Sequence, residues 1–247
     1  MQNKRVYFLS DAHLGASFLH DNEERERKLV AFLERIAPNC SALYLLGDMF
    51  DFWFEYKRVV PRGHVRFLGA LARFSDAGIP VHFFTGNHDA WAFNYLAREC
   101  GVILNDNNGW IIMGGKLFLV GHGDGLDPTD KKYLFLKRVF RSRFLQRAFR
   151  LLHPDIGIRL ARAWSTHSRM GHVESPSYRG DDHEGIVLYC KSVLQRRHVD
   201  YFIFGHRHLP VDIPISPTSR YINTGDWITH FSYATFDGTT LEMLREE

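Results

Sequence analysis

Five short apolar runs in the chain each end at a small residue that is followed by a carboxylate, an amide or an imidazole. The runs have the length and the β-branched and aromatic content of buried strands. Such strands end at the rim of a sheet, where α/β folds place their chemistry. The five segments are residues 8–13, 45–51, 83–89, 119–123 and 202–208. The pattern therefore predicts polar side chains gathered at one edge of a sheet.

The elements between these segments change in character along the chain. Leu29, Phe32, Leu33 and Ile36 recur with helical spacing, and Pro38 follows, which predicts an amphipathic helix. Other helices are expected at residues 62–77, 91–100 and 181–197, and strands at 5–10, 41–46, 81–85 and 199–204. The early β-α order predicts parallel strands. Short strands within 102–120 and at 219–223, 231–236 and 240–244 predict antiparallel pairing in the second half.

Residues 131–153 form a basic segment with eight Lys or Arg and no acidic residue. The formal net charge of the chain is +3, so the remainder carries 3 − 8 = −5. Aromatic and aliphatic residues are interleaved with the cations, and they do not share one helical face. This pattern predicts two short helices within 131–152, a third helix at 155–164, and a polar loop at 165–180.

Composition indicates the class of protein and its compartment. A chain of 247 residues with 45% hydrophobic content can form one large α/β domain, residues 1–247, with an insertion at about 125–180. Cys40, Cys100 and Cys190 are an odd number without CxxC spacing, so neither a disulfide framework nor a thiolate zinc site is indicated. No signal-peptide core or membrane-spanning run is seen, which favours a reducing, cytoplasmic location.

The polar residues after the five runs are of the types that bind metals. Asp11 and His13 are two positions apart, so in an extended segment they project to the same side. Carboxylates, imidazoles and an amide from five segments give enough donors for two metal ions, with Asp48 as the expected bridge. His88 would be a proton donor beside the site, and Asp89 could fix its tautomer.

The motif order Asp-x-His, Gly-Asp, Gly-Asn-His-Asp, Gly-His-Gly and Gly-His-x-His resembles that of the calcineurin-like metallophosphoesterases over almost the whole chain. The resemblance implies an α/β sandwich of two mixed β-sheets flanked by helices, with a helical cap insertion. It also implies two divalent metal ions, a hydroxide nucleophile, and His88 acting on the phosphoryl group with Asp89 orienting it. One ion would be held by Asp11, His13, Asp48 and His208, and the other by Asp48, Asn87, His122 and His206.

Within that family the chain looks most like the UDP-2,3-diacylglucosamine diphosphatases of lipid A biosynthesis, which carry a helical, basic and apolar cap between the fourth and fifth motifs. The resemblance implies hydrolysis at the α-phosphorus to UMP and 2,3-diacylglucosamine 1-phosphate, with Mn²⁺ as the expected metal. It also implies an amphipathic, lipid-linked sugar nucleotide as substrate and peripheral contact with the inner face of the cell membrane. The implied substrate-binding residues are Asn87, His88, Asp130, Ser165, Ser168 and Arg169.

One departure keeps other functions open. Well-known members of that group have Gly-Asn-Arg-Asp where this chain has Gly-Asn-His-Asp. A nuclease could use the basic segment to follow a phosphate backbone, although nucleic acid is not the favoured partner. A phosphodiesterase or phosphatase for soluble nucleotides would not need so apolar a cap, and a scaffold without activity should have lost ligands. The aromatic residues 50–56 either pack beneath their loop or line an apolar cleft.

Overall fold

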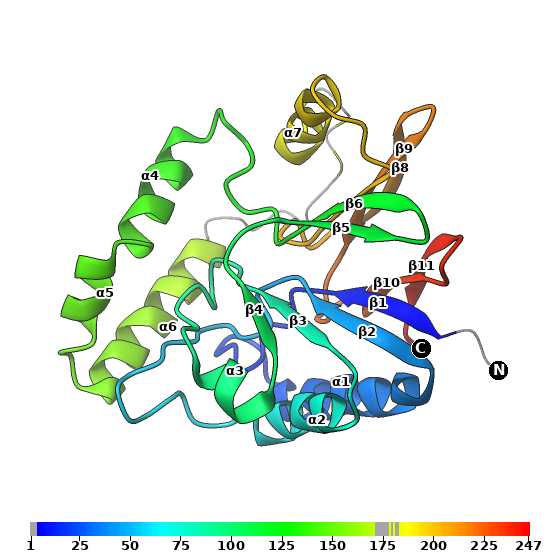
Figure 1. The fold of residues 1–247 in the computed structure, drawn as a ribbon. Helices are drawn as coiled ribbons and strands as arrows, with labels where there is room; N and C mark the ends of the chain where they lie inside the picture. Colours follow the sequence, from blue (N-terminus) through cyan, green and yellow to red (C-terminus); the bar gives the residue numbers. More distant parts are fainter. Residues whose placement is uncertain (1–3, 171–177, 179, 181–182) are drawn as a thin grey trace.

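Two mixed β-sheets packed face to face form the centre of the molecule (Figure 1). The structure is a computed structural model, and it describes residues 4–170, 178, 180 and 183–247, apart from the side chains of 162 and 164–170. The first sheet has the strand order β11-β10-β1-β2-β3-β4, and the second has the order β5-β6-β7-β9-β8. The expected α/β sandwich is therefore confirmed.

The bounds of the strands follow the predicted runs closely. The first sheet contains β1 (Arg5–Leu9), β2 (Cys40–Leu45), β3 (Val81–Phe84), β4 (Ile103–Asn105), β10 (Ser232–Phe236) and β11 (Leu241–Arg245). The second sheet contains β5 (Gly109–Met113), β6 (Lys116–Val120), β7 (Tyr201–Phe204), β8 (Pro210–Ser216) and β9 (Ser219–Thr224). Strands β1 to β4 are mutually parallel, whereas β10 pairs antiparallel with β1. The parallel first half matches the prediction, whereas the second half is only partly antiparallel, because β7 pairs parallel with both β6 and β9.

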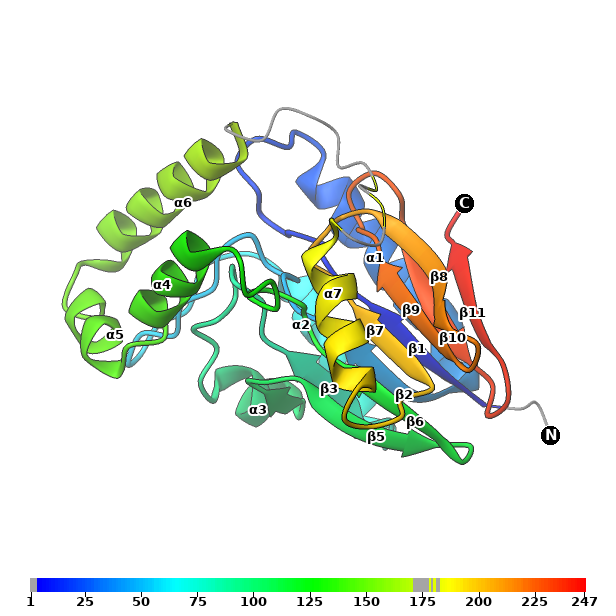
Figure 2. The ribbon, with the colours of Figure 1, turned by 90° about the horizontal axis from the view of Figure 1, so that it is seen from above.

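Helices cover the outer faces of the two sheets. The helices α1 (Asn22–Ile36) and α2 (Val65–Asp76) lie under the first sheet, with the short η1 (Ala37–Asn39) and α3 (Tyr95–Cys100) nearby, and α7 (Gly185–Leu194) covers the second sheet (Figures 1 and 2). The remaining helices, α4 (Lys131–Phe140), α5 (Arg143–Phe149) and α6 (Pro154–Met170), stand to one side of the sandwich in both views. We call these three helices the cap.

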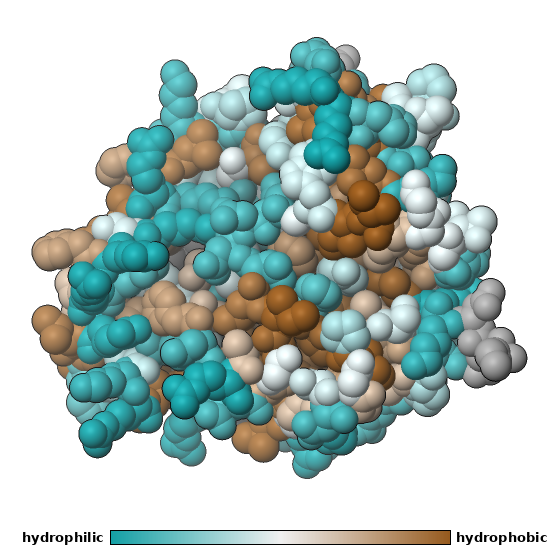
Figure 3. Space-filling view, viewed as in Figure 1, coloured by the Kyte–Doolittle hydropathy of each residue, from teal (hydrophilic) through white to brown (hydrophobic). Residues whose placement is uncertain are grey.

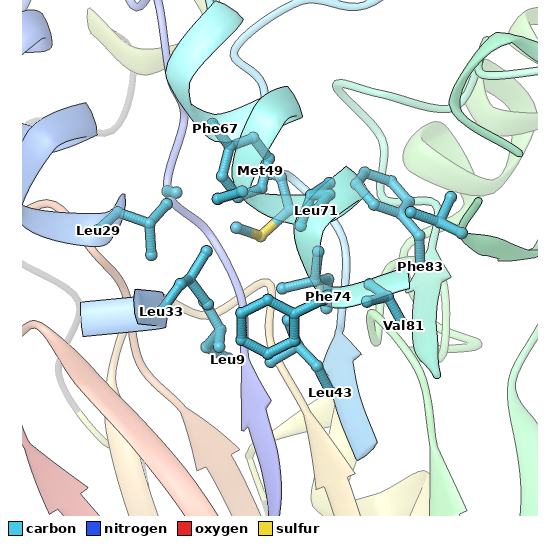
Figure 4. Packing of buried hydrophobic residues seen from close by; sticks show 14 of the residues in the cluster. Leu9, Leu29, Leu33, Leu43, Met49, Phe67, Leu71, Phe74, Val81 and Phe83 are labelled. Atoms are coloured by element: carbon cyan, nitrogen blue, oxygen red, sulfur yellow. The ribbon is translucent and has the colours of Figure 1, made fainter. Parts of the chain in front are cut away.

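Strand β1 shows how the sequence pattern builds the layers, because neighbouring side chains on a strand point to opposite faces. Phe8 lies between the two sheets, with its ring 5.0 Å from that of Tyr44 and 6.3 Å from that of Phe118. Leu9 points the other way, into the core between the first sheet and the helices α1 and α2. Figure 4 shows side chains of this core. Both faces of the strand are thus buried, and its end is held rigidly.

The structure differs from the predicted boundaries at two helices. Helix α6 continues to Met170, although a loop was expected from residue 165. No Gly or Pro interrupts the sequence from 158 to 170, so its Ser and Thr residues were misread as loop signals. Helix α2 begins at Val65 rather than at residue 62, because Gly63 and His64 have φ values of 101° and 61°, which a right-handed helix excludes.

Two further elements were misjudged from the sequence. Helix α3 begins only at Tyr95, because the preceding segment pairs with the aromatic loop through a Phe54–Trp91 bridge. Strand β8 was not predicted, and it contains Pro210 and Pro214, a residue type that is rare inside a sheet. It lies at the edge of the second sheet, where a residue without an N–H is tolerated.

Candidate functional site

Seven polar side chains from five loops converge at one end of the sandwich. Each loop directly follows the carboxyl end of a strand, namely β1, β2, β3, β6 or β7. The residues are Asp11, His13, Asp48, Asn87, His122, His206 and His208. The structure therefore brings together all seven residues for which metal binding was expected.

Asp11, His13 and His208 form the first cluster, in which the potential ligand atoms lie within 4.8 Å of one another. The Nε2 atoms of His13 and His208 are 3.2 Å apart, and His208 Nε2 lies 3.3 Å from Asp11 Oδ1. Asp11 Oδ1 is buried and has no hydrogen-bond partner among the described residues. Burying a carboxylate oxygen without a hydrogen-bond partner costs free energy. A cation bound next to Asp11 Oδ1 would offset that cost.

Asp48, His122 and His206 form the second cluster. His122 Nε2 lies 3.3 Å from Asp48 Oδ2 and 3.2 Å from the side-chain oxygen of Asn87. Asp48 Oδ2 is also 3.6 Å from His13 Nε2, so this carboxylate faces both clusters. Two adjacent Asp/His clusters with a shared carboxylate are consistent with a dinuclear metal site.

In three of the histidines, the Nδ1 atom lies close to a neighbouring oxygen that orients the ring. The Nε2 atom of each is then available to bind a metal ion. His122 Nδ1 is 2.8 Å from the carbonyl oxygen of Leu46. His13 Nδ1 lies 3.4 Å from Asp51 Oδ1, and His208 Nδ1 lies 3.6 Å from Asp226 Oδ2. The sequence prediction missed both of these carboxylates. Asp226 could have been found, because it follows β9 and a glycine in the same way as the predicted ligands follow their strands.

The backbone at the site is held in an uncommon conformation. Asp11, His13, Asp48, His206 and His208 have positive φ values of 55°, 42°, 52°, 71° and 52°. Residues other than glycine adopt this left-handed region rarely, and such conformations concentrate at functional sites. Gly86 has a different task, because a Cβ at this position would overlap the Asp48 carboxylate. The five loops are thus shaped to aim side chains inward at the expense of local stability.

His88 lies beside the first cluster, with its ring 4.7 Å from that of His13. Its Nδ1 atom is 2.7 Å from the backbone oxygen of Asp51, and its backbone N–H donates to Asp48 Oδ1 over 2.8 Å. The expectation that Asp89 orients His88 is wrong in this structure. Asp89 instead accepts backbone N–H groups from Gly86, at 2.7 Å, and Met49, at 2.9 Å, so it ties two ligand loops together.

Burial and close charges shift the pKa values of these groups. Burial raises the pKa of Asp11, and burial followed by the charge of Asp48 raises that of Asp89 to about 7. Burial opposes ionisation of Asp48, but the adjacent His122 and His88 hold its pKa well below the usual value. Burial would lower the pKa of His122, yet Asp48 raises it to about 10, while burial and His122 lower that of His206 to about 3. At pH 7 these shifts favour a protonated His122 and a neutral His206 in the metal-free site.

A sequence profile of the calcineurin-like phosphoesterases matches residues 4–210. This chain belongs to that family. It is 41% identical to the UDP-2,3-diacylglucosamine hydrolase of Porphyromonas gingivalis, over 97% of this chain and 96% of that protein. It is 28% identical to the UDP-2,3-diacylglucosamine hydrolase of Edwardsiella ictaluri, over 96% of this chain and 90% of that protein. Among solved structures it resembles Yfce, a phosphoesterase from E. coli, with a TM-score of 0.46 and 13% identity over 98% of this chain and 92% of that one.

The structure describes the side chains of only three of the six expected substrate-binding residues. Asn87 and His88 line an apolar cavity that opens on the metal-type clusters. Asp130 is exposed and caps α4, where its side chain accepts the backbone N–H of Tyr133 over 2.9 Å. Ser165, Ser168 and Arg169 lie in α6, but their side chains are outside the described residues.

Proposed function

We propose that this phosphoesterase hydrolyses the diphosphate of UDP-2,3-diacylglucosamine and releases UMP and 2,3-diacylglucosamine 1-phosphate. Relatives that match nearly its whole length are named for that substrate. The observation that carries the proposal is an apolar cavity of about 340 Å³ between the cap and the Asn87–His88 edge of the site. In this proposal, the segment at about 125–180, which includes the cap, is an insertion in a single domain that spans 1–247.

Aromatic side chains from the body and the cap build this apolar cavity. Phe52 and Trp91 of the body and Phe140 and Phe149 of the cap all line it. The Trp91 indole donates a hydrogen bond of 2.7 Å to the backbone oxygen of Phe140, and its ring lies 5.0 Å from that of Phe149. Phe54 in the same aromatic loop is fully buried, so the loop both packs and lines the cavity. An aromatic-lined slot of this kind suits an acyl chain.

Cations from α4 stand at the polar border of the apolar cavity. Lys137 Nζ lies 2.7 Å from Asp124 Oδ2, and Tyr133 donates a hydrogen bond of 3.0 Å to the same oxygen. Arg141 also lines the cavity and donates to the backbone oxygen of Asp106 over 2.7 Å. A substrate with its lipid in the cavity would bring its diphosphate toward these cations and the two clusters.

The mechanism follows from where each side chain lies. We propose that Asp11, His13, Asp48 and His208 hold one ion, and that Asp48, Asn87, His122 and His206 hold the other. Two such ions, for which we propose Mn²⁺, would lower the pKa of a water and neutralise phosphate oxygens. His88 has its Nδ1 atom bound to the Asp51 carbonyl, so Nε2 is available to hydrogen-bond or protonate the departing phosphate.

The site should release protons when it takes up metal. At pH 7 the metal-free protein carries a proton on His122, whose pKa is about 10, whereas a metal ligand must be the neutral imidazole. We expect at least about one proton to be released per protein near pH 7, and metal affinity to rise with pH until about 10. Calorimetric titration of Mn²⁺ in buffers of different ionisation enthalpy measures this number. A binding enthalpy that is independent of the buffer would contradict it, and the exposed His198→Ala variant should behave as wild type.

The reaction itself is tested by product analysis. The purified protein is incubated with Mn²⁺ and detergent-solubilised UDP-2,3-diacylglucosamine, and products are identified by phosphorus NMR and mass spectrometry. UMP together with acylated sugar phosphate, both stopped by EDTA, is the expected result. Metal-dependent cleavage of simple aryl phosphodiesters without turnover of the lipid would instead support a phosphodiesterase for soluble substrates. Steeply salt-dependent binding and cleavage of DNA would support a nuclease.

The outer face of the cap is suited to contact an anionic membrane surface. Large apolar side chains, including Phe135, Phe144 and Leu151, are exposed there among the basic residues of 131–153, and hydrophobic and hydrophilic side chains intermingle at the left of Figure 3. Within the described part of the chain, no helix is both long and apolar enough to cross a membrane. We therefore propose peripheral contact through the cap, at the inner face of the cell membrane.

Charge substitution at the cap tests this contact. Phe144 is 76% exposed and Leu151 is 88% exposed, so Phe144→Asp and Leu151→Asp should leave the fold intact. Each should lower co-sedimentation with phosphatidylserine vesicles by roughly tenfold, because an apolar side chain is withdrawn and a negative charge is added. Val65→Asp is the matched control, since Val65 is 77% exposed on α2. Equal sedimentation of all four proteins would overturn the proposal.

A further inference from the structure

A second cavity, of about 310 Å³, shares Lys137 and Arg141 with the apolar cavity. The connection between β4 and β5 supplies Asn107 and Asn108 to its wall, and Trp110 and Tyr189 supply aromatic side chains. We call it the asparagine pocket. Its polar lining distinguishes it from the apolar cavity, so it suits a ligand of different chemistry.

The asparagine pocket and the apolar cavity meet beside the metal-type clusters. Asp124, Lys137 and Arg141 line both. His122 lines the asparagine pocket, and its Nε2 atom is 3.3 Å from Asp48 Oδ2. Asn87 and His88 line the apolar cavity. A molecule that holds a phosphate group at the clusters can therefore extend one end into each space.

The asparagine pocket offers hydrogen-bonding groups that the protein itself does not use. The side-chain amides of Asn107 and Asn108 have no hydrogen-bond partner among the described residues, and Asn107 is exposed. One carboxamide can accept the N3–H of uracil and donate to a neighbouring carbonyl, and a second carboxamide can donate to the other carbonyl, so two together match the acceptor–donor–acceptor edge of uracil. The rings of Trp110 and Tyr189 offer flat surfaces for a base to pack against, and Lys137 and Arg141 are cations for its 5′-phosphate.

We propose that the asparagine pocket binds the uridine half of the substrate, with Asn107 and Asn108 reading the base. This inference rests on the proposed function, because it assigns the nucleotide end of the same substrate. The lipid and nucleotide ends then lie on opposite sides of the Lys137–Asp124 contact, and the diphosphate crosses between them. The base is a specificity element in addition to the acyl chains.

The test compares the dissociation constants of UMP and CMP in the presence of Mn²⁺. Both nucleotides carry the same ribose and phosphate, so the ratio of the two constants isolates recognition of the base. Wild type should bind UMP more tightly than CMP by about tenfold, and Asn107→Ala and Asn108→Ala should each reduce that preference by roughly three- to tenfold. Ile112→Ala is the control, since Ile112 is exposed on β5 and does not line the asparagine pocket. Because Asn107 is exposed, the Asn107→Ala variant should remain folded.

The same proteins are assayed for hydrolysis of UDP-2,3-diacylglucosamine, which separates the two proposals. Equal affinity for UMP and CMP, or a preference unchanged in both variants, overturns the asparagine pocket as a uridine site even if the lipid is hydrolysed. A UMP preference that both variants lose, without hydrolysis of the lipid, upholds the uridine site and overturns the proposed reaction.

Discussion

Asp48→Ala is expected to lower turnover of UDP-2,3-diacylglucosamine by at least about 10³-fold while the protein stays folded. The reason is geometric, because Asp48 Oδ2 faces His13 at 3.6 Å and His122 at 3.3 Å and so belongs to both clusters. Its removal also takes away the charge that raises the pKa of His122. Both the affinity for metal and the catalytic rate should therefore fall in this variant. Steady-state kinetics with a Mn²⁺ titration, alongside circular dichroism, measures the two effects.

Two controls make the Asp48 result interpretable. Asp48→Asn keeps an oxygen that can accept the backbone N–H of His88, now at 2.8 Å, so it tests the charge without removing that contact. Glu99→Ala removes an exposed carboxylate elsewhere and should have no effect. Turnover retained by metal-stripped Asp48→Ala protein would show that the reaction does not depend on two ions held by this carboxylate.

His88→Ala should lower kcat by about 10²-fold and leave Mn²⁺ affinity nearly unchanged. His88 contacts the site without belonging to the expected ligand set, and its Nδ1 atom is held by the Asp51 carbonyl at 2.7 Å. The ring lies against the apolar cavity, so its loss removes a donor to the phosphate rather than a ligand. Kinetics under saturating metal, compared with a calorimetric metal titration, separate these roles.

His88→Arg gives the second half of that test. Arg occupies this position in well-known members of the group, and it offers a fixed charge but cannot give up a proton. Activity restored by Arg would show that positive charge is sufficient, whereas activity as low as in His88→Ala would assign a proton transfer to His88. Wild-type kcat in His88→Ala would remove His88 from the mechanism.

The convergence of the site was predictable because its parts obey one local rule. Each of the seven residues follows a buried strand, and the carboxyl ends of these strands meet at one end of the sandwich. The alternation of side chains such as Phe8 and Leu9 was likewise visible in the sequence. The positions of most strands and the two helices in the basic segment also followed from periodicity and length.

Groups that act through tertiary contact were not predictable in this way. The role of Asp89 depended on which N–H groups lie within reach, and the structure places those of Gly86 and Met49 there instead of the His88 ring. Asp51 supports His13 only because two loops meet in space. The start of α3 was shifted by Glu55, whose carboxylate accepts the N–H groups of Asn94 and Tyr95 from another part of the chain.

The pairing of β1 with β10 has a consequence for synthesis of the protein. Strand β1 lies between β2 and β10 in the first sheet, yet β10 follows it along the chain only at Ser232–Phe236. His206 and His208 also come late in the chain. During synthesis, β1 therefore has an open sheet edge and the site is incomplete until these later segments have been made. Hydrolytic activity should therefore appear only after β10 has been made, and until then a chaperone can cover the open edge of β1.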